Sequence, residues 1–113
     1  MKNEEQFEDH FRVLRKINKD PNISQRKMAE DLGFSLGKLN YCLKALKKKG
    51  FVKLQNFKDK KNKFKYFQHV ITPRGISHRL SLTVYFMKKK MNEYDELKNE
   101  IEIENKNSTN EKK

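Results

Sequence analysis

Three scarcities limit what this 113-residue chain can be. Cys42 is the one cysteine, so no internal disulfide can form, and the count suits a reducing compartment. Long apolar runs are absent, because the longest covers only residues 84–87 and a membrane-spanning helix needs roughly 20 residues. Residues 1–9 are polar and acidic, unlike a signal peptide. At 35% hydrophobic content, the sequence predicts a cytoplasmic protein with one modest core and no membrane partner.

Catalytic and metal-binding patterns are also missing. His10, His69 and His78 fall in different predicted elements, without ligand spacing or a companion cysteine pair, which argues against a metal site. The sequence contains no glycine-rich phosphate loop, no paired catalytic carboxylates and no nucleophile motif. We therefore expect no enzyme, no catalytic residue and no cofactor.

Acidic residues are nearly excluded from residues 38–65, where eleven lysines accompany the single acid Asp59. This block of 28 residues carries +10 of the chain's formal net charge of +12, so the remaining 85 residues carry only +2. A block of one sign attracts a polyanion and releases its counterions, which points to nucleic acid. The alternative, a solvated surface in a lysine-rich protein, stays open.

The first half of the chain has the pattern of three helices. Apolar residues at spacings of four, three and three predict a helix over residues 4–18, and the proline after Asp20 ends it. Ser24 and Ser35 are placed to cap two further helices, and Gly33 separates them in a short turn. Such a pair of capped helices predicts a helix-turn-helix. The stripe of the first helix consists of Phe7, Phe11, Leu14 and Ile17.

The third helix is predicted over residues 36–49, with Gly50 just past its end. At about 100° per residue, its side chains separate into an apolar face and a basic, aromatic face. The apolar face comprises Leu36, Leu39, Cys42, Leu43 and Leu46, and the opposite face comprises Gly37, Tyr41, Lys44 and Lys48.

A β-hairpin is expected next, from two segments rich in aromatic and β-branched residues, 51–54 and 64–71, with a lysine-rich tip over residues 55–63. A basic hairpin directly after a helix-turn-helix is the outline of a winged helix. Thr72 and Pro73 then open a predicted helix that reaches about residue 104, roughly 48 Å long and too long for a small domain to cover. Residues 105–113 are polar and are expected to be disordered.

The long helix carries an apolar seam that predicts a helix-to-helix partner contact. Leu80, Met87, Tyr94 and Ile101 recur every seven residues, whereas Thr83 and Lys90 interrupt the intermediate positions. The predicted dimer interface consists of Ile76, Leu80, Val84, Met87, Tyr94, Leu97 and Ile101. The predicted fold is mainly α with a small β-hairpin, divided into a DNA-binding domain (residues 1–72), a dimerisation helix (73–104) and a tail (105–113).

The string from Ser24 through Leu46, followed by Gly50-Phe51-Val52-Lys53, resembles the DNA-binding region of the MarR family of bacterial transcriptional regulators. Within that family it is similar to the small regulators associated with exopolysaccharide biosynthesis. The likeness extends through most of residues 6–104, including the segment from Ile71 to Ile76 and the segment 91–97. It implies a winged-helix homodimer that reads a promoter, with the third helix as recognition helix and the hairpin as wing. Larger members have a pair of C-terminal helices and an arginine at the wing tip, whereas this chain offers one helix and Asp59-Lys60-Lys61.

The candidate DNA-binding residues lie on the third helix and the wing. They are Ser35, Gly37, Lys38, Asn40, Tyr41, Lys44 and Lys48 on the helix, and Lys58, Lys60, Lys61 and Lys63 on the wing. Three of these residues have an ordinary alternative. Tyr41 would be a surface aromatic packed on lysine, Asn40 a solvated polar residue, and Gly37 a packing requirement against the second helix. Cys42 is interpreted as a small core hydrophobe, with a redox switch as the alternative.

The sequence thus predicts a sequence-specific regulator that binds double-stranded DNA as a homodimer, with exopolysaccharide genes as a possible target set. One alternative is a winged helix that binds RNA or DNA without sequence preference, because the same lysines would serve it equally well. Another is an interaction protein whose long helix docks a different polypeptide through the acidic residues 93–104. No residue pattern identifies a small-molecule effector.

Overall fold

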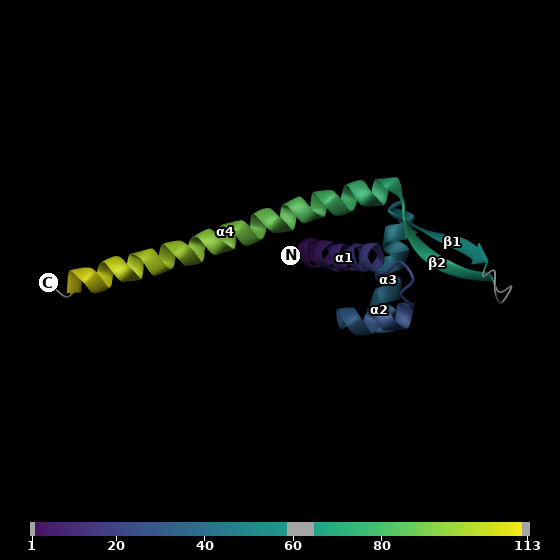
Figure 1. Cartoon of the computed structure of the whole chain (residues 1–113), viewed down its shortest axis with the longest axis horizontal. Coiled ribbons are helices and arrows are strands. Elements are labelled where there is room, and N and C mark those ends of the chain that lie inside the picture. The colour runs from purple at the N-terminus through teal and green to yellow at the C-terminus, as the bar shows by residue number, and fades with distance from the viewer. Residues whose placement is uncertain (1, 59–64, 112–113) are drawn as a thin grey trace. The chain divides into compact units, whose positions relative to one another are not determined.

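A computed structural model describes residues 2–58 and 65–111 of the chain (Figure 1). The elements follow in the order α1 (Lys2–Lys19), α2 (Gln25–Leu32), α3 (Leu36–Lys48), β1 (Val52–Lys58), β2 (Lys65–Ile71) and α4 (Pro73–Glu111). The chain divides into two compact units, Met1–Leu82 and Thr83–Lys113, and the division falls inside α4. The first unit therefore extends ten residues beyond the boundary at residue 72 that the sequence suggested.

The predicted caps form the ends of α2 and α3. The hydroxyl of Ser24 accepts a hydrogen bond from the Lys27 amide at 3.1 Å, and that of Ser35 accepts one from the Lys38 amide at 3.0 Å. Gly33 follows α2 in the left-handed conformation with φ of 70°, which favours glycine. Gly33 thus turns the chain from α2 into α3, and the helix-turn-helix is confirmed.

The core of the first unit lies between the first three helices and the start of the hairpin. Its fully buried side chains include Val13 and Leu14 of α1, Met28 of α2, and Leu39 and Leu46 of α3. Two residues assigned to apolar stripes are not in this core. Phe7 is 39% exposed and Leu36 is 45% exposed. Both stand near helix N-termini, so the stripe continues beyond the point where a neighbouring element covers it.

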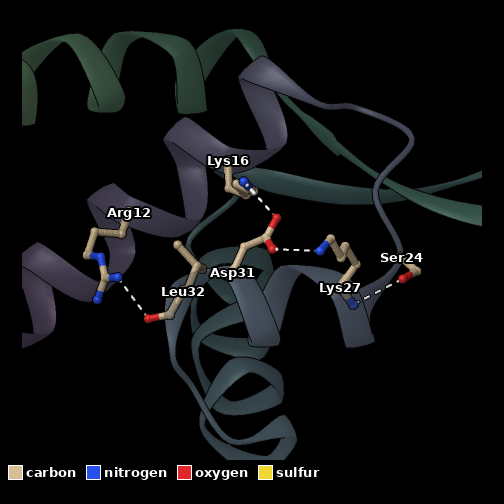
Figure 2. Close-up of polar contacts among 6 residues, drawn as sticks. All are labelled: Arg12, Lys16, Ser24, Lys27, Asp31 and Leu32. Carbon is tan, nitrogen blue, oxygen red and sulfur yellow. Dashed lines mark hydrogen bonds and ion pairs between the residues drawn. The ribbon is translucent and has the colours of Figure 1, made fainter.

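Polar contacts fasten α2 to α1 (Figure 2). The guanidinium of Arg12 donates to the carbonyl oxygen of Leu32 at 2.8 Å, which satisfies one of the carbonyls left without an intrahelical partner at the end of α2. The carboxylate of Asp31 forms ion pairs with the ammonium nitrogens of Lys16, at 2.9 Å, and Lys27, at 3.2 Å. Hydrogen bonds from these two ammonium groups hold the pKa of the Asp31 carboxyl below its usual value. The second helix is therefore positioned by charged groups as well as by its apolar face.

The hairpin is longer than the sequence suggested. β1 and β2 pair antiparallel from Val52 opposite Ile71 to Lys58 opposite Lys65. Residues 55–58, expected in the tip, belong to β1 instead, because backbone pairing does not require apolar side chains. The remaining tip residues, 59–64, lie outside the described residues.

Thr72 joins the hairpin to α4. Its hydroxyl donates to the carbonyl oxygen of Gly50 at 2.6 Å and accepts from the amide of Gly75 at 3.0 Å, so the predicted cap is confirmed. The amide of Thr72 also donates to the carbonyl oxygen of Phe51 at 3.0 Å. Gly75 is buried against this turn, and a Cβ added there would overlap the backbone of Phe51. No residue other than glycine fits without displacing the chain.

Helix α4 runs without interruption from Pro73 to Glu111, so residues 105–111 are helical where a disordered tail was expected. In the second unit, none of the side chains described at positions 83–109 is buried. The seven residues of the predicted dimer interface are all between 45% and 65% exposed. No helix in the described part of the chain combines the length and apolarity needed to span a membrane.

Candidate nucleic-acid interface

The outward face of α3 collects the predicted recognition residues. Its sequence, from Leu36 to Lys48, contains no acidic residue. Tyr41 is 68% exposed, on the side opposite the buried Leu39 and Leu43. The predicted residues that share this exposed surface are Ser35, Gly37, Lys38, Asn40, Tyr41, Lys44 and Lys48. A basic surface with an aromatic and an amide group on one helix offers both phosphate and base contacts.

Gly37 lies in the first turn of α3 with open space beside it. A Cβ added at this position would meet only the Ser35 hydroxyl, at 3.9 Å, and the backbone is not in a conformation that requires glycine. The packing explanation for Gly37 against α2 therefore has no support. Glycine costs a helix about 1 kcal/mol relative to alanine, and that cost is offset by nothing inside the described chain. The predicted approach of the N-terminus of α3 to a phosphate stays a prediction.

Lys38 is held by the first unit itself. Its ammonium lies 3.3 Å from the Asp9 carboxylate of α1 and 4.4 Å from the ring centre of Phe34. The sequence analysis missed Asp9, since nothing in the local pattern connects residues 29 positions apart. Part of the charge of Lys38 is therefore compensated by Asp9 before any phosphate binds.

A hollow of about 310 Å³ lies beside the recognition face, and Asp9, His10, Lys38, Tyr41 and Cys42 are among its lining residues. His10 is fully buried, and neither ring nitrogen has a hydrogen-bond partner among the described residues. Burial lowers the pKa of His10, Lys49 and His78 lower it further, and Asp9 opposes them. The imidazole is therefore neutral near pH 7.

Cys42 is buried against α1, and burial raises the pKa of its thiol. A thiol that stays protonated is a poor nucleophile, so the structure favours the core-hydrophobe interpretation over a redox switch. Within residues 2–58 and 65–111, no group of three histidine, cysteine or acidic side chains could hold a metal ion.

The wing residues are placed only in part. Lys58 is the last residue of β1, opposite Lys65 in the register, so both strands bring a lysine to the distal end of the hairpin. Lys60, Lys61 and Lys63 lie outside the described residues. Their role as wing contacts stays a prediction.

The hairpin is hydrogen-bonded to the turn that precedes the helix-turn-helix, a contact that the sequence did not predict. The side-chain amide nitrogen Nε2 of Gln68, on β2, donates to the side-chain oxygen of Asn22 at 2.8 Å and to the backbone carbonyl oxygen of Pro21. These acceptors lie in the turn between α1 and α2. The wing is thereby oriented by the same turn that positions α2.

The family model of the winged helix-turn-helix DNA-binding domain matches residues 10–53. This match covers most of α1, both helices of the helix-turn-helix and the start of β1. Among curated proteins, no sequence matches this chain.

Solved structures of bacterial regulators share the fold. The chain is similar to MarR of Staphylococcus aureus in complex with salicylate and kanamycin, with a TM-score of 0.60, 17% identity, and coverage of 78% of this chain and 57% of that one. It is also similar to the transcriptional regulator PcaV of Streptomyces coelicolor in complex with its natural ligand (TM-score 0.58, 18% identity, coverage 71% and 55%). A third is the MepR–DNA complex of S. aureus (TM-score 0.57, 19% identity, coverage 78% and 59%).

The chain thus spans less than two thirds of the length of each of these three relatives. At identities below 20%, the likeness establishes the fold. That fold is a winged helix-turn-helix with a small two-stranded hairpin and a long C-terminal helix.

Proposed function

We propose that this chain is a transcriptional regulator of the MarR type that binds double-stranded DNA sequence-specifically as a homodimer in the bacterial cytoplasm. The observation that carries the proposal is the outward face of α3, which is exposed, free of acidic residues and presented by a winged helix-turn-helix. The DNA complex of MepR, which shares the fold, supports DNA as the ligand.

In the proposed complex α3 lies in the major groove. Its N-terminus approaches a phosphate at Gly37, where the absence of a side chain and the free amides of the first turn favour an anion. Asn40 and Tyr41 reach base edges, and Lys44 contributes to either bases or phosphate. Lys48, in the last turn of α3, contacts the backbone.

The hairpin supplies a second contact with the duplex. Lys58, Lys60, Lys61 and Lys63 bind the neighbouring phosphates or enter the minor groove. Because Gln68 ties the hairpin to the turn before α2, wing and recognition helix would dock together. Lysine contacts set the affinity, and the few side chains of α3 set the sequence preference.

Dimerisation supplies the second half-site. The exposed interface residues of α4 have no cover in one copy of the chain, which supports a partner helix. The regulated genes include those of exopolysaccharide biosynthesis, a proposal that rests on the sequence resemblance.

The test compares specific with non-specific binding at fixed salt. Genomic fragments retained by the purified protein are sequenced, and a labelled fragment from that set is titrated with and without excess bulk DNA. Survival of the complex in bulk DNA supports sequence-specific binding. Its complete displacement favours the rival interpretation, a nucleic-acid-binding module without sequence preference.

Substitutions on α3 then locate the base contacts. Tyr41→Ala and Lys44→Ala should each weaken binding to the retained fragment by about 1 to 3 kcal/mol more than binding to random DNA. Lys106→Ala, an exposed lysine on α4, is the matched control and should leave both affinities unchanged. Equal losses on the two DNAs would restrict Tyr41 and Lys44 to backbone contacts.

A further inference from the structure

We propose that two copies of this chain pair through residues 84–108 of α4 in antiparallel orientation. The inference rests on the homodimer of the proposed function and specifies its geometry. It concerns the second unit, whose apolar side chains are exposed and whose charges are unevenly distributed along the helix.

Five of the eight large apolar residues that are exposed in the described part of the second unit follow a heptad repeat, whereas Tyr85, Leu97 and Ile103 lie outside it. Val84 and Met91 form one set of seam positions, seven residues apart. Met87, Tyr94 and Ile101 form the other set, three residues after the first. Alternating spacings of three and four define the seam of a two-stranded coiled coil. Each of these five side chains is at least 45% exposed, so no element in the described part of the chain buries the seam.

Charge changes sign along the same helix. Lys88, Lys89 and Lys90 form a basic cluster near its start, whereas residues 93–104 contain six acids and a single lysine, Lys98. In a parallel pair, the basic clusters of both copies would lie side by side, and so would the acidic segments. An antiparallel pair places each basic cluster beside the partner's acidic segment.

The antiparallel register centred on residue 96 brings the largest number of opposite charges together, although Met87 then lies opposite the partner's Asn105 and Val84 opposite the partner's Ser108. With the two-fold axis at residue 96, Met91 packs opposite the partner's Ile101, and Lys98 lies opposite the partner's Tyr94. The positions that flank this seam then carry opposite charges. Lys88 lies near the partner's Glu102, and Lys90 near the partner's Glu104. Symmetry repeats both pairs at the other end of the dimer.

The parallel register fails at the seam itself. Two parallel chains in register would place Lys98 against the partner's Lys98 in the apolar seam, with no acid at the same level. In the antiparallel register, Lys98 lies one residue from the level of the partner's Asp95 and can pair with it. Among the residues that the structure describes, no ion pair engages Lys88, Lys90, Glu102 or Glu104 within one chain, so their charges are available to a second copy.

Charge reversal in the full-length chain tests the orientation. The variant Glu102→Lys/Glu104→Lys should weaken the homodimer about tenfold or more, because four attractive pairs become repulsive. Lys88→Glu/Lys90→Glu should weaken it similarly. An equimolar mixture of the two variants should restore the affinity of the original chain, and so should one chain that carries all four reversals.

These substitutions are on exposed positions, so circular dichroism should show unchanged helical folding in every variant. Sedimentation equilibrium measures the dimer dissociation constants. A monomeric original chain would overturn the homodimer and with it the proposed function's mode of action. A dimeric original chain whose Glu102→Lys/Glu104→Lys variant dimerises equally well or better would overturn only the antiparallel orientation.

Distances between spin labels give an independent readout. In a Cys42→Ala background, single labels are placed at Asn99→Cys and Lys106→Cys, which lie on one outward face seven residues apart. At 1.5 Å per residue, the antiparallel register gives axial separations of about 9 Å at position 99 and about 30 Å at position 106. A parallel pair would give the same separation at both positions, and this result would overturn the proposal.

Discussion

The two units of this chain treat their apolar residues in opposite ways. In the first unit, the leucines, valines and isoleucines of α1 and α3 are buried except for Leu36, and acids such as Asp9 and Asp31 form ion pairs with lysines of neighbouring elements. In the second unit, Met91, Tyr94 and Ile101 are all more than half exposed. Apolar content is therefore a poor guide to a core. What matters is whether the chain supplies a second surface to cover it.

The contrast separates what each unit needs for stability. The first unit has a buried apolar core formed by three helices and the start of the hairpin, so we expect it to fold on its own. The helix of the second unit has no buried side chain among the described residues, although most helical stability in proteins comes from packing. Under the proposal made above, the second unit would gain its packing from a second copy of the chain.

Removal of most of the second unit should have the largest effect on dimerisation and DNA binding. A chain that ends after Lys88 should be a folded monomer, and its affinity for the retained DNA fragment should fall by about 100-fold or more, because two linked half-sites become independent. Light scattering and DNA titration measure both effects. A chain that ends after Lys106 keeps the seam and is the control. A dimeric product of the first truncation would place the dimer interface within residues 1–88 and would contradict the proposed pairing of residues 84–108.

Gly75→Ala adds a methyl group where the first turn of α4 packs directly on the backbone of Phe51. The added methyl group overlaps the carbonyl oxygen of Phe51, so the variant should lose about 3 kcal/mol of unfolding free energy. Urea denaturation followed by circular dichroism near 222 nm measures the loss. A change below about 0.5 kcal/mol would mean that the start of α4 moves away from Phe51 at little cost.

His10→Leu removes the buried imidazole, whose two nitrogens lack partners among the described residues. Because burial lowers the pKa of His10 below its usual value of about 6.5, the unfolded chain binds more protons than the folded chain as the pH falls below 6.5. The free energy of unfolding that depends on neutral His10 is therefore fully present above about pH 6.5 and decreases as the pH falls below that value. One such group contributes a slope of at most about 1.4 kcal/mol per pH unit.

The leucine variant should match or exceed the original chain at pH 8, by about 1 kcal/mol at most, and should lose less stability between pH 7 and pH 5. Denaturation midpoints across that range measure the difference. The pKa values of His69 and His78 are also lowered by burial, so part of the acid sensitivity should persist. Parallel pH profiles for the two chains would show that His10 does not titrate differently on folding.

Gly37→Ala should have the smallest effect on stability and the opposite sign. The open space beside Gly37 accepts a methyl group, so the variant should gain up to about 1 kcal/mol. If α3 approaches a phosphate there, the same variant should bind DNA more weakly although it is more stable. Unchanged DNA affinity would remove the N-terminus of α3 from the proposed interface.

Features encoded by neighbouring residues were predictable. The capping serines, the turn at Gly33 and the Thr72 cap depend on side chains within a few positions, and the structure confirms all of them. Contacts between distant residues were not. Lys38 with Asp9 and Gln68 with Asn22 join segments 29 and 46 positions apart, and no spacing in the sequence links them.

The boundaries of the strands and the burial of individual side chains were harder to predict than the presence of each helix and strand. The polar residues Gln55 and Asn56 resemble a loop, yet backbone pairing with β2 keeps them in a strand. The burial of His10 was missed for a related reason. Its spacing of four and seven residues from Leu14 and Ile17 puts it on the apolar stripe, but a histidine there was not expected to be buried. The contribution of each predicted recognition residue to DNA binding stays a prediction.

Thr72 has a mechanical consequence. One hydroxyl joins the residue that follows β2 to the carbonyl after α3 and to an amide in the first turn of α4. The first turn of α4 is thus connected to the end of α3 by two hydrogen bonds of Thr72 and by the buried contact of Gly75 with Phe51. We therefore expect a rotation of the first turn of α4 to be coupled to the end of α3, the helix proposed to bind DNA.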